Sequence, residues 1–112
     1  MIIVTSSQIA GRRIVKTLGL VRGNTIRARN IGKDIVAVLK QIVGGEIEEY
    51  TKLMAEAREQ SLDRLVAEAE SLGADAVIDV RFTTSEVMNA AAEILVYGTA
   101  VITEPENSQI RE

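Results

Sequence analysis

The feature that most constrains the fold is the long amphipathic segment Glu46–Leu72. Its apolar and small residues recur every three or four positions, which draws one stripe along a helix: Ile47, Tyr50, Met54, Ala57, Ser61, Leu65, Ala69 and Leu72. Gly73 follows, where a helix that ends in a left-handed residue places its glycine. A helix of this length spans roughly 40 Å, which exceeds the need of a small domain. We therefore expect it to bend, or to pack in part on a neighbouring subunit.

Beyond Gly73 the hydrophobic period changes from helical spacing to two, as in a strand. One face of this strand carries Ala76, Ile78, Val80 and Phe82, and the other carries Val77, Asp79, Arg81, Thr83 and Ser85. Because the first set is the more apolar, we expect it to lie beneath the helix. The pair of segments predicts a helix laid on a sheet.

The N-terminal part predicts further strands. Ile2–Thr5 is typical of a short strand, and Arg13–Val21 and Thr25–Arg29 alternate as longer ones. Gly23-Asn24 between them suits either a tight hairpin turn or a bend in one long strand. We favour the single bent strand.

A shorter helix and a last strand complete the expected elements. Asn30 caps a predicted helix over Lys33–Val43, and Gly44-Gly45 turns it into the long helix. Residues 88–92 are predicted as a loop, and Glu93–Thr103 as the last strand. The fold class is therefore α+β, with two layers: a mostly antiparallel sheet packed by one short and one long helix.

Length and composition exclude several classes of protein. With 112 residues the chain fits one domain, which we place at 1–104, followed by a flexible tail over 105–112. It has no cysteine and no histidine, so disulfides, thiolate sites and imidazole bases are excluded. No nucleophile with a neighbouring base is evident, and we expect no enzymatic activity. The apolar Met1–Val4 is too short for a secretory signal, so we expect a cytoplasmic protein without membrane contact.

Charge and the last strand both favour self-association. Residues 11–33 hold seven basic residues and no acid, whereas residues 46–72 hold eight acids and three bases. Opposite patches on one small protein attract each other across copies. Both faces of the last strand are apolar, and one helix layer covers only one face of a sheet. We expect a second copy to cover the other face, with these interface residues: Leu95, Tyr97, Thr99 and Val101.

The order of these segments resembles the YbjQ-like family of small bacterial and archaeal proteins, which is also labelled a heavy-metal-binding domain. The resemblance runs to about residue 103 and is carried by these motifs: Ile3-Val4-Thr5-Ser6, Leu18-Gly19-Leu20-Val21 with Gly23, Asn30-Ile31-Gly32-Lys33-Asp34, Ile42-Val43-Gly44-Gly45 with Tyr50, Glu56-Ala57-Arg58, Leu72-Gly73-Ala74-Asp75-Ala76-Val77 and Gly98-Thr99-Ala100-Val101. It implies a fold similar to the dodecin subunit and a ring-shaped homopentamer, and it implies no activity.

The leading hypothesis is a non-enzymatic homo-oligomer, with a small ligand at its subunit interfaces as one form of it. No cofactor is predicted, although a metal ion is one alternative: carboxylates would hold a hard cation, with Asp34, Asp75 and Asp79 as candidates beside Glu86 and Glu93. In a second alternative, the basic ribbon Arg12–Lys33 binds anions or nucleic acid. Nucleic acid is disfavoured because no aromatic residue interleaves with the ribbon. A phosphate site at Gly44-Gly45 is disfavoured by the glutamates that follow.

Overall fold

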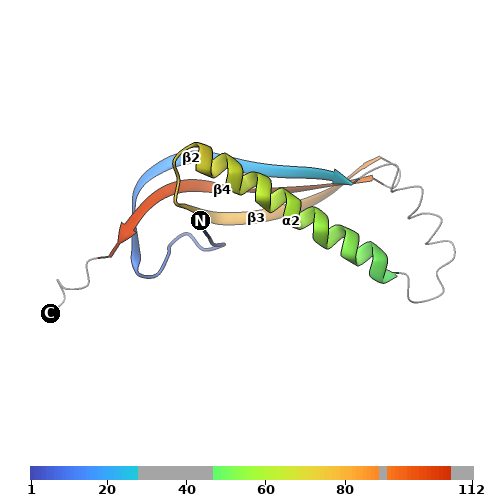
Figure 1. Ribbon diagram of the computed structural model, residues 1–112, viewed down its shortest axis with the longest axis horizontal. Helices are drawn as coiled ribbons and strands as arrows, with labels where there is room; N and C mark the ends of the chain where they lie inside the picture. Colours follow the sequence, from blue (N-terminus) through green and yellow to red (C-terminus); the bar gives the residue numbers. More distant parts are fainter. Residues whose placement is uncertain (28–46, 89–90, 107–112) are drawn as a thin grey trace.

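The computed structural model describes residues 1–27, 47–88 and 91–106. Within them a four-stranded sheet of order β1-β3-β4-β2 carries a long helix on one face (Figure 1). The elements are β1 (Ile2–Ile3), β2 (Arg12–Arg27), α2 (Ile47–Ser71), β3 (Ala76–Met88) and β4 (Ala91–Pro105). β1 runs parallel to β3, and the other pairs are antiparallel. This two-layer α+β architecture confirms the predicted fold class, while the predicted helix Lys33–Val43 and its Gly44-Gly45 corner lie outside the described residues.

β2 is one long strand, as the favoured interpretation predicted, and it pairs with β4 from Arg12↔Pro105 to Arg27↔Ala92. Gly23 is the point where the helix crosses it closely. A Cβ at this position would come within 2.6 Å of the Leu65 nitrogen and still closer to the Ser61 carbonyl oxygen. Glycine is therefore required here by close approach of two backbones rather than by a turn.

α2 buries the middle of the predicted stripe. Ala57, Ser61, Leu65 and Ala69 are fully buried, and Leu65 packs in the main core with Val21, Val77, Val80 and Val96. Burying one such side chain contributes about 1.5–3 kcal/mol. Leu72, at the end of the predicted stripe, is instead 47% exposed because it lies beyond the last helical turn.

The C-terminal end of α2 is a Schellman cap. Gly73 has φ 86°, the Gly73 N–H donates to the Glu70 carbonyl, and the Ala74 N–H donates to the Ala69 carbonyl. At its other end the helix runs past the sheet, as the green end of α2 shows in Figure 1. The side chains of Ile47 and Tyr50 in that part lie outside the described residues.

The faces predicted for β3 are wrong before residue 79. Val77 and Val80 pack in the core beneath α2, whereas Ala76 and Ile78 pack on the opposite face. A bulge between Ile78 and Arg81, with Asp79 at φ 55°, inserts one residue and inverts the alternation. After the bulge Phe82 does lie on the helix side, opposite Val96, but it is 45% exposed because α2 packs on β2 and β4.

Both ends of β4 extend beyond the prediction. β3 continues to Met88 and β4 begins at Ala91, so the strands take up most of the predicted loop 88–92. Pro105 pairs with Arg12, and the Glu106 N–H donates to the Gly11 carbonyl at 2.9 Å. The first two residues of the predicted tail 105–112 therefore belong to the folded part.

Within the described chain, no helix combines the length and apolar character needed to cross a membrane.

Candidate functional site

The face of the sheet opposite α2, here called the far face, divides into two halves. In the covered half, Ala76, Ile78 and Val101 are buried. The N-terminal residues Ile2, Val4 and Ile9 pack on them together with Ile14. The covering segment is held by its backbone, because the Val4 N–H donates to the Val77 carbonyl and the Asp79 N–H donates to the Ser6 carbonyl. This half is sealed within one protomer.

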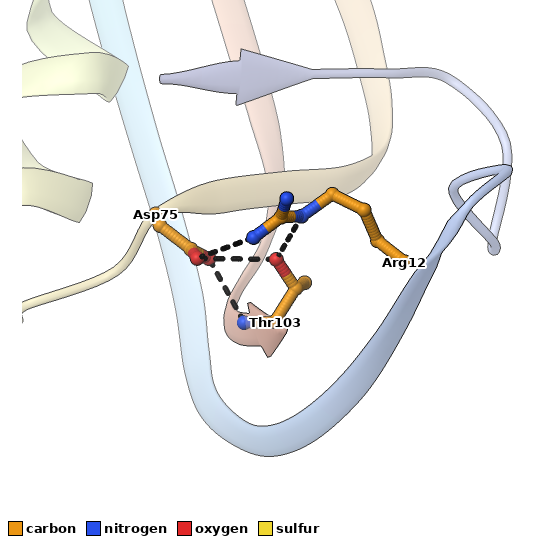
Figure 2. A network of polar contacts seen from close by, with 3 residues as sticks. All are labelled: Arg12, Asp75 and Thr103. Carbon is orange, nitrogen blue, oxygen red and sulfur yellow. Dashed lines mark hydrogen bonds and ion pairs between the residues drawn. The ribbon is translucent and has the colours of Figure 1, made fainter. Parts of the chain in front are cut away.

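A polar network closes the outer end of the covered half (Figure 2). The Arg12 Nε–H donates to Thr103 Oγ1 at 2.7 Å, and the Thr103 hydroxyl and N–H donate to the two Asp75 carboxylate oxygens at 3.1 and 3.0 Å. Arg12 Nη2 lies 3.6 Å from Asp75 Oδ2. The network ties the first residue of β2 and the residue before β3 to the end of β4. Its groups satisfy one another, which is the arrangement expected of a structural clamp.

A half-open pocket of about 590 Å³ lies beside this clamp. It is lined by the loop before β2, the start of β2 and the end of the folded chain: Gln8, Ile9, Ala10, Gly11, Arg12, Arg13, Ile14 and Glu106. Its guanidinium groups already face carboxylates, since Arg13 pairs with Glu104 at 2.6 Å and Arg12 with Asp75. The pocket therefore offers no unpaired guanidinium group to an anionic ligand.

The open half of the far face lies beyond the reach of the N-terminal segment. Leu20 is 64% exposed, Ile26 54% and Tyr97 38%. Their places on this face follow from the register, which sets Leu20 opposite Thr99, Arg22 opposite Tyr97 and Ile26 opposite Glu93. Apolar side chains gathered on one exposed face are the usual mark of an interaction surface.

The four predicted interface residues divide between the two halves. Leu95, Tyr97 and Thr99 lie on the open half, and their role as an interface stays a prediction. Val101 is fully buried within the protomer, so it has no surface left for a second copy. The prediction for Val101 is wrong because the N-terminal segment, whose path the alternation of the last strand does not reveal, packs on it.

The open half also brings together residues that sequence reasoning kept apart. Arg22 of β2 and Arg81 of β3 both stand directly opposite Tyr97 of β4, so the three form one row across the sheet, here called the Arg22–Tyr97–Arg81 row. The basic ribbon has no aromatic residue of its own along the chain. Tyr97 of β4 lies beside the ribbon only because of the strand register. No local spacing in the sequence indicates that neighbour.

The candidate carboxylates do not converge. Asp75 belongs to the clamp, Asp79 stands in the bulge, and Glu93 accepts a hydrogen bond from Asn24 Nδ2 at 3.1 Å. Asp34 lies outside the described residues, as does the side chain of Glu86. In ranges 1–27, 47–88 and 91–106, no three metal-binding side chains are grouped.

Comparison with known proteins places this chain among small proteins of similar length. A family model named YbjQ_1, described as "Putative heavy-metal-binding", matches residues 1–104. A UPF0145 protein from Methanosarcina acetivorans is 58% identical over 101 residues, covering 90% of this chain and 95% of that protein. A UPF0145 protein from Dehalococcoides mccartyi is 58% identical over 104 residues, covering 93% of this chain and 100% of the relative.

A solved structure shows the same fold. It is a crystal structure of a protein of unknown function from Pediococcus pentosaceus, of the DUF74 family, with TM-score 0.64 and 18% identity. The match covers 93% of this chain and 98% of that one.

The heavy-metal description does not fit the donors present in this chain. Soft and borderline metals are held by thiolate and imidazole groups, and the sequence has neither cysteine nor histidine. The carboxylate that is best placed, Asp75, is engaged by the Thr103 hydroxyl and N–H and lies beside the Arg12 guanidinium. We therefore derive no role for a heavy metal here.

Proposed function

This chain belongs to the YbjQ family, and from that premise we propose that it is a non-enzymatic homo-oligomeric binding protein. Copies meet over the open half of the far face, around Leu95, Tyr97 and Thr99. The observation that supports this proposal is the exposure of Leu20, Ile26 and Tyr97 on a sheet face that the protomer covers only at its other half. A ring of five copies, which the family resemblance implies, is the assembly that we expect.

The edges of the sheet add support. At the β2 edge, α2 satisfies outward backbone groups: Glu68 Oε1 accepts from the Arg22 N–H at 2.7 Å, and Arg64 Nη1 donates to the Asn24 carbonyl at 2.6 Å. At the β3 edge, β1 pairs only with Ala76 and Val77. From Phe82 to Met88 no described strand lies on the outer side of β3. An unprotected edge of this kind is suited to pairing with another chain.

Sedimentation velocity at micromolar concentration tests the assembly. The wild-type protein is expected to sediment as a species several times heavier than the 12.2 kDa protomer. A Leu95→Glu variant places a charge in the proposed interface and is expected to shift the protein towards the monomer, because an unpaired buried charge opposes association. Gln60→Glu, an exposed position on α2, adds the same charge elsewhere and should leave the assembly intact. A wild-type monomer at this concentration would refute the proposal.

A further inference from the structure

The outer edge of β2 is closed by two charged side chains of α2, Arg64 and Glu68, here called the edge guards. Glu68 Oε1 accepts a hydrogen bond from the Arg22 N–H at 2.7 Å, and Arg64 Nη1 donates to the Asn24 carbonyl at 2.6 Å. Both backbone groups point away from β4, and hydrogen bonds to a charged partner are the strong ones. A strand added at this edge would need these two groups and would find them already bonded.

The guards fit the edge because the spacing of the helix matches that of the strand. Four residues of helix rise about 6 Å, and two residues of strand rise about 6.8 Å. α2 runs antiparallel to β2 here, so Glu68 meets Arg22 while Arg64 meets Asn24. Gly23 lies between these two strand residues, and a Cβ at this position would come within 2.9 Å of the Arg64 Cβ. The close crossing at Gly23 therefore holds both guards over the edge.

The opposite edge of the sheet is open from Phe82 onwards. The Val80 N–H donates outwards to the Val4 carbonyl. Because outward and inward residues alternate along a strand, the backbone groups of Phe82 and Thr84 point to the same outer side as those of Val80. Both residues are exposed, and no described strand lies beside them on that side. This stretch of β3 offers a strand the bonds that the guarded stretch of β2 withholds.

The guarded and open stretches lie level with each other across the sheet. The Arg22–Tyr97–Arg81 row sets the first guarded residue of β2 level with Arg81, the residue before the open stretch of β3. The two strands also run in the same direction, since both are antiparallel to β4. A second copy placed beside the first in the same orientation therefore sets its β3 edge against this β2 edge. Because every copy has both edges, such a contact adds copies without end unless it closes into a ring.

We propose that Arg64 and Glu68 keep the β2 edge closed to the β3 edge of a second copy, and so prevent copies from joining edge to edge in an open-ended sheet. The guards occupy the outward N–H of Arg22 and the outward carbonyl of Asn24. An added strand loses a ladder bond at each of these residues and meets the guard side chains in its path. The inference goes beyond the proposed assembly, whose contact is the far face, and it leaves β3 open to strands other than β2.

Removal of both guards tests the inference. Arg64→Ala/Glu68→Ala leaves the net charge unchanged and places a good helix former at two exposed positions, so the fold should be retained, as circular dichroism checks. In sedimentation velocity the variant should form species about tenfold heavier than the wild type or more, because open-ended contacts add copies without limit. Arg58→Ala/Glu59→Ala removes the same charges from exposed positions of α2 and should sediment as the wild type does. Absence of growth in the folded guard variant overturns the inference, as does equal growth in the control.

A proline on β3 identifies the edge that carries the growth. Thr84→Pro removes an outward N–H that an added strand needs, at an outer edge where proline is tolerated. Combined with Arg64→Ala/Glu68→Ala, it should return sedimentation to that of the wild type. Growth that persists in the combined variant shows that β3 is not the partner of the opened edge, and the inference is then wrong.

Amide hydrogen exchange tests a guard in a single variant that does not have to assemble. In the wild type the Arg22 N–H should exchange slowly although it lies at the outer edge, because Glu68 accepts its hydrogen bond. Glu68→Ala should accelerate this exchange about tenfold, whereas Glu59→Ala should leave it unchanged. Equal exchange in the wild type and Glu68→Ala means that the guard is not formed, which overturns the inference.

Leu95→Glu separates the inference from the proposed assembly. This substitution is expected to dissociate the wild-type assembly, but growth of the guard variant through the β3 edge should continue in its presence. Growth that Leu95→Glu abolishes is carried by the far face, which contradicts the inference and leaves the assembly standing. A wild-type monomer whose guard variant grows and is stopped by Thr84→Pro refutes the assembly and supports the inference.

Discussion

The covered and open halves of the far face are built by the same strands, β2, β3 and β4, yet they differ in what lies over them. In the covered half, Ala76, Ile78 and Val101 are sealed by the N-terminal segment and closed by the Arg12–Asp75–Thr103 clamp. In the open half, Tyr97 remains exposed although it continues the alternation of β4 from Val101, and Leu20, opposite Thr99, is exposed as well. An apolar face is therefore no guarantee of burial: the reach of another segment decides which part becomes core and which part becomes surface.

The bulge at Asp79 lies between the two halves. It sits between the last β3 residue packed under the N-terminal segment, Ile78, and the first β3 residue of the open half, Arg81. The Asp79 N–H donates to the Ser6 carbonyl, and Arg81 donates to the Thr5 carbonyl. The N-terminal segment thus ends its contact with β3 where the strand changes register.

The largest difference between the halves is expected from a buried charge. Ile78→Asp places a carboxylate in the covered half and should lower the free energy of unfolding by more than about 3 kcal/mol, enough to unfold a small domain. Leu20→Asp places the same charge at a position that one protomer leaves exposed, and it should change the free energy of unfolding of the isolated protomer by less than about 1 kcal/mol. Urea unfolding followed by circular dichroism measures both. Equal losses in the two variants would mean that the halves do not differ in burial.

A smaller effect is expected from the clamp that closes the covered half. Thr103→Val removes the hydroxyl that bridges Arg12 and Asp75 and should cost about 1–2 kcal/mol, because two charged groups lose a hydrogen-bond partner in a half-buried site. Arg13→Gln breaks the neighbouring Arg13–Glu104 pair, whose side chains are both exposed, and should cost less than about 0.5 kcal/mol. Thermal unfolding of both variants checks this ranking, and an equal or larger cost for Arg13→Gln would contradict the role given to the clamp.

The smallest effect is expected at the boundary itself. Asp79 has φ 55°, a region that glycine enters freely and alanine does not. Asp79→Ala should therefore be less stable than Asp79→Gly by about 1 kcal/mol, whereas ordinary strand positions favour alanine. Chemical unfolding of the two variants gives the difference directly, and a more stable alanine variant would show that residue 79 does not hold this conformation in solution.

Local signals predicted the individual elements well. The stripe from Ala57 to Ala69, the Gly73 cap and the single long strand through Gly23 all appear in the structure, since each depends on periodicity or backbone preference within a few residues. The candidate site was predicted only in part: Leu95, Tyr97 and Thr99 lie on an open face, but Val101 does not. The arginines that flank Tyr97 were not foreseen, because residues 22 and 81 meet it only through strand register.

By itself, the sequence determined the kind and order of the elements and the exclusion of thiolate and imidazole chemistry, because these follow from residue types and short-range spacing. The tertiary structure alone decided which apolar face becomes core. A one-residue bulge at Asp79 inverts the alternation of β3, and the N-terminal segment covers one half of the far face and leaves the other open. Both depend on contacts between segments far apart in the chain, which no local pattern encodes.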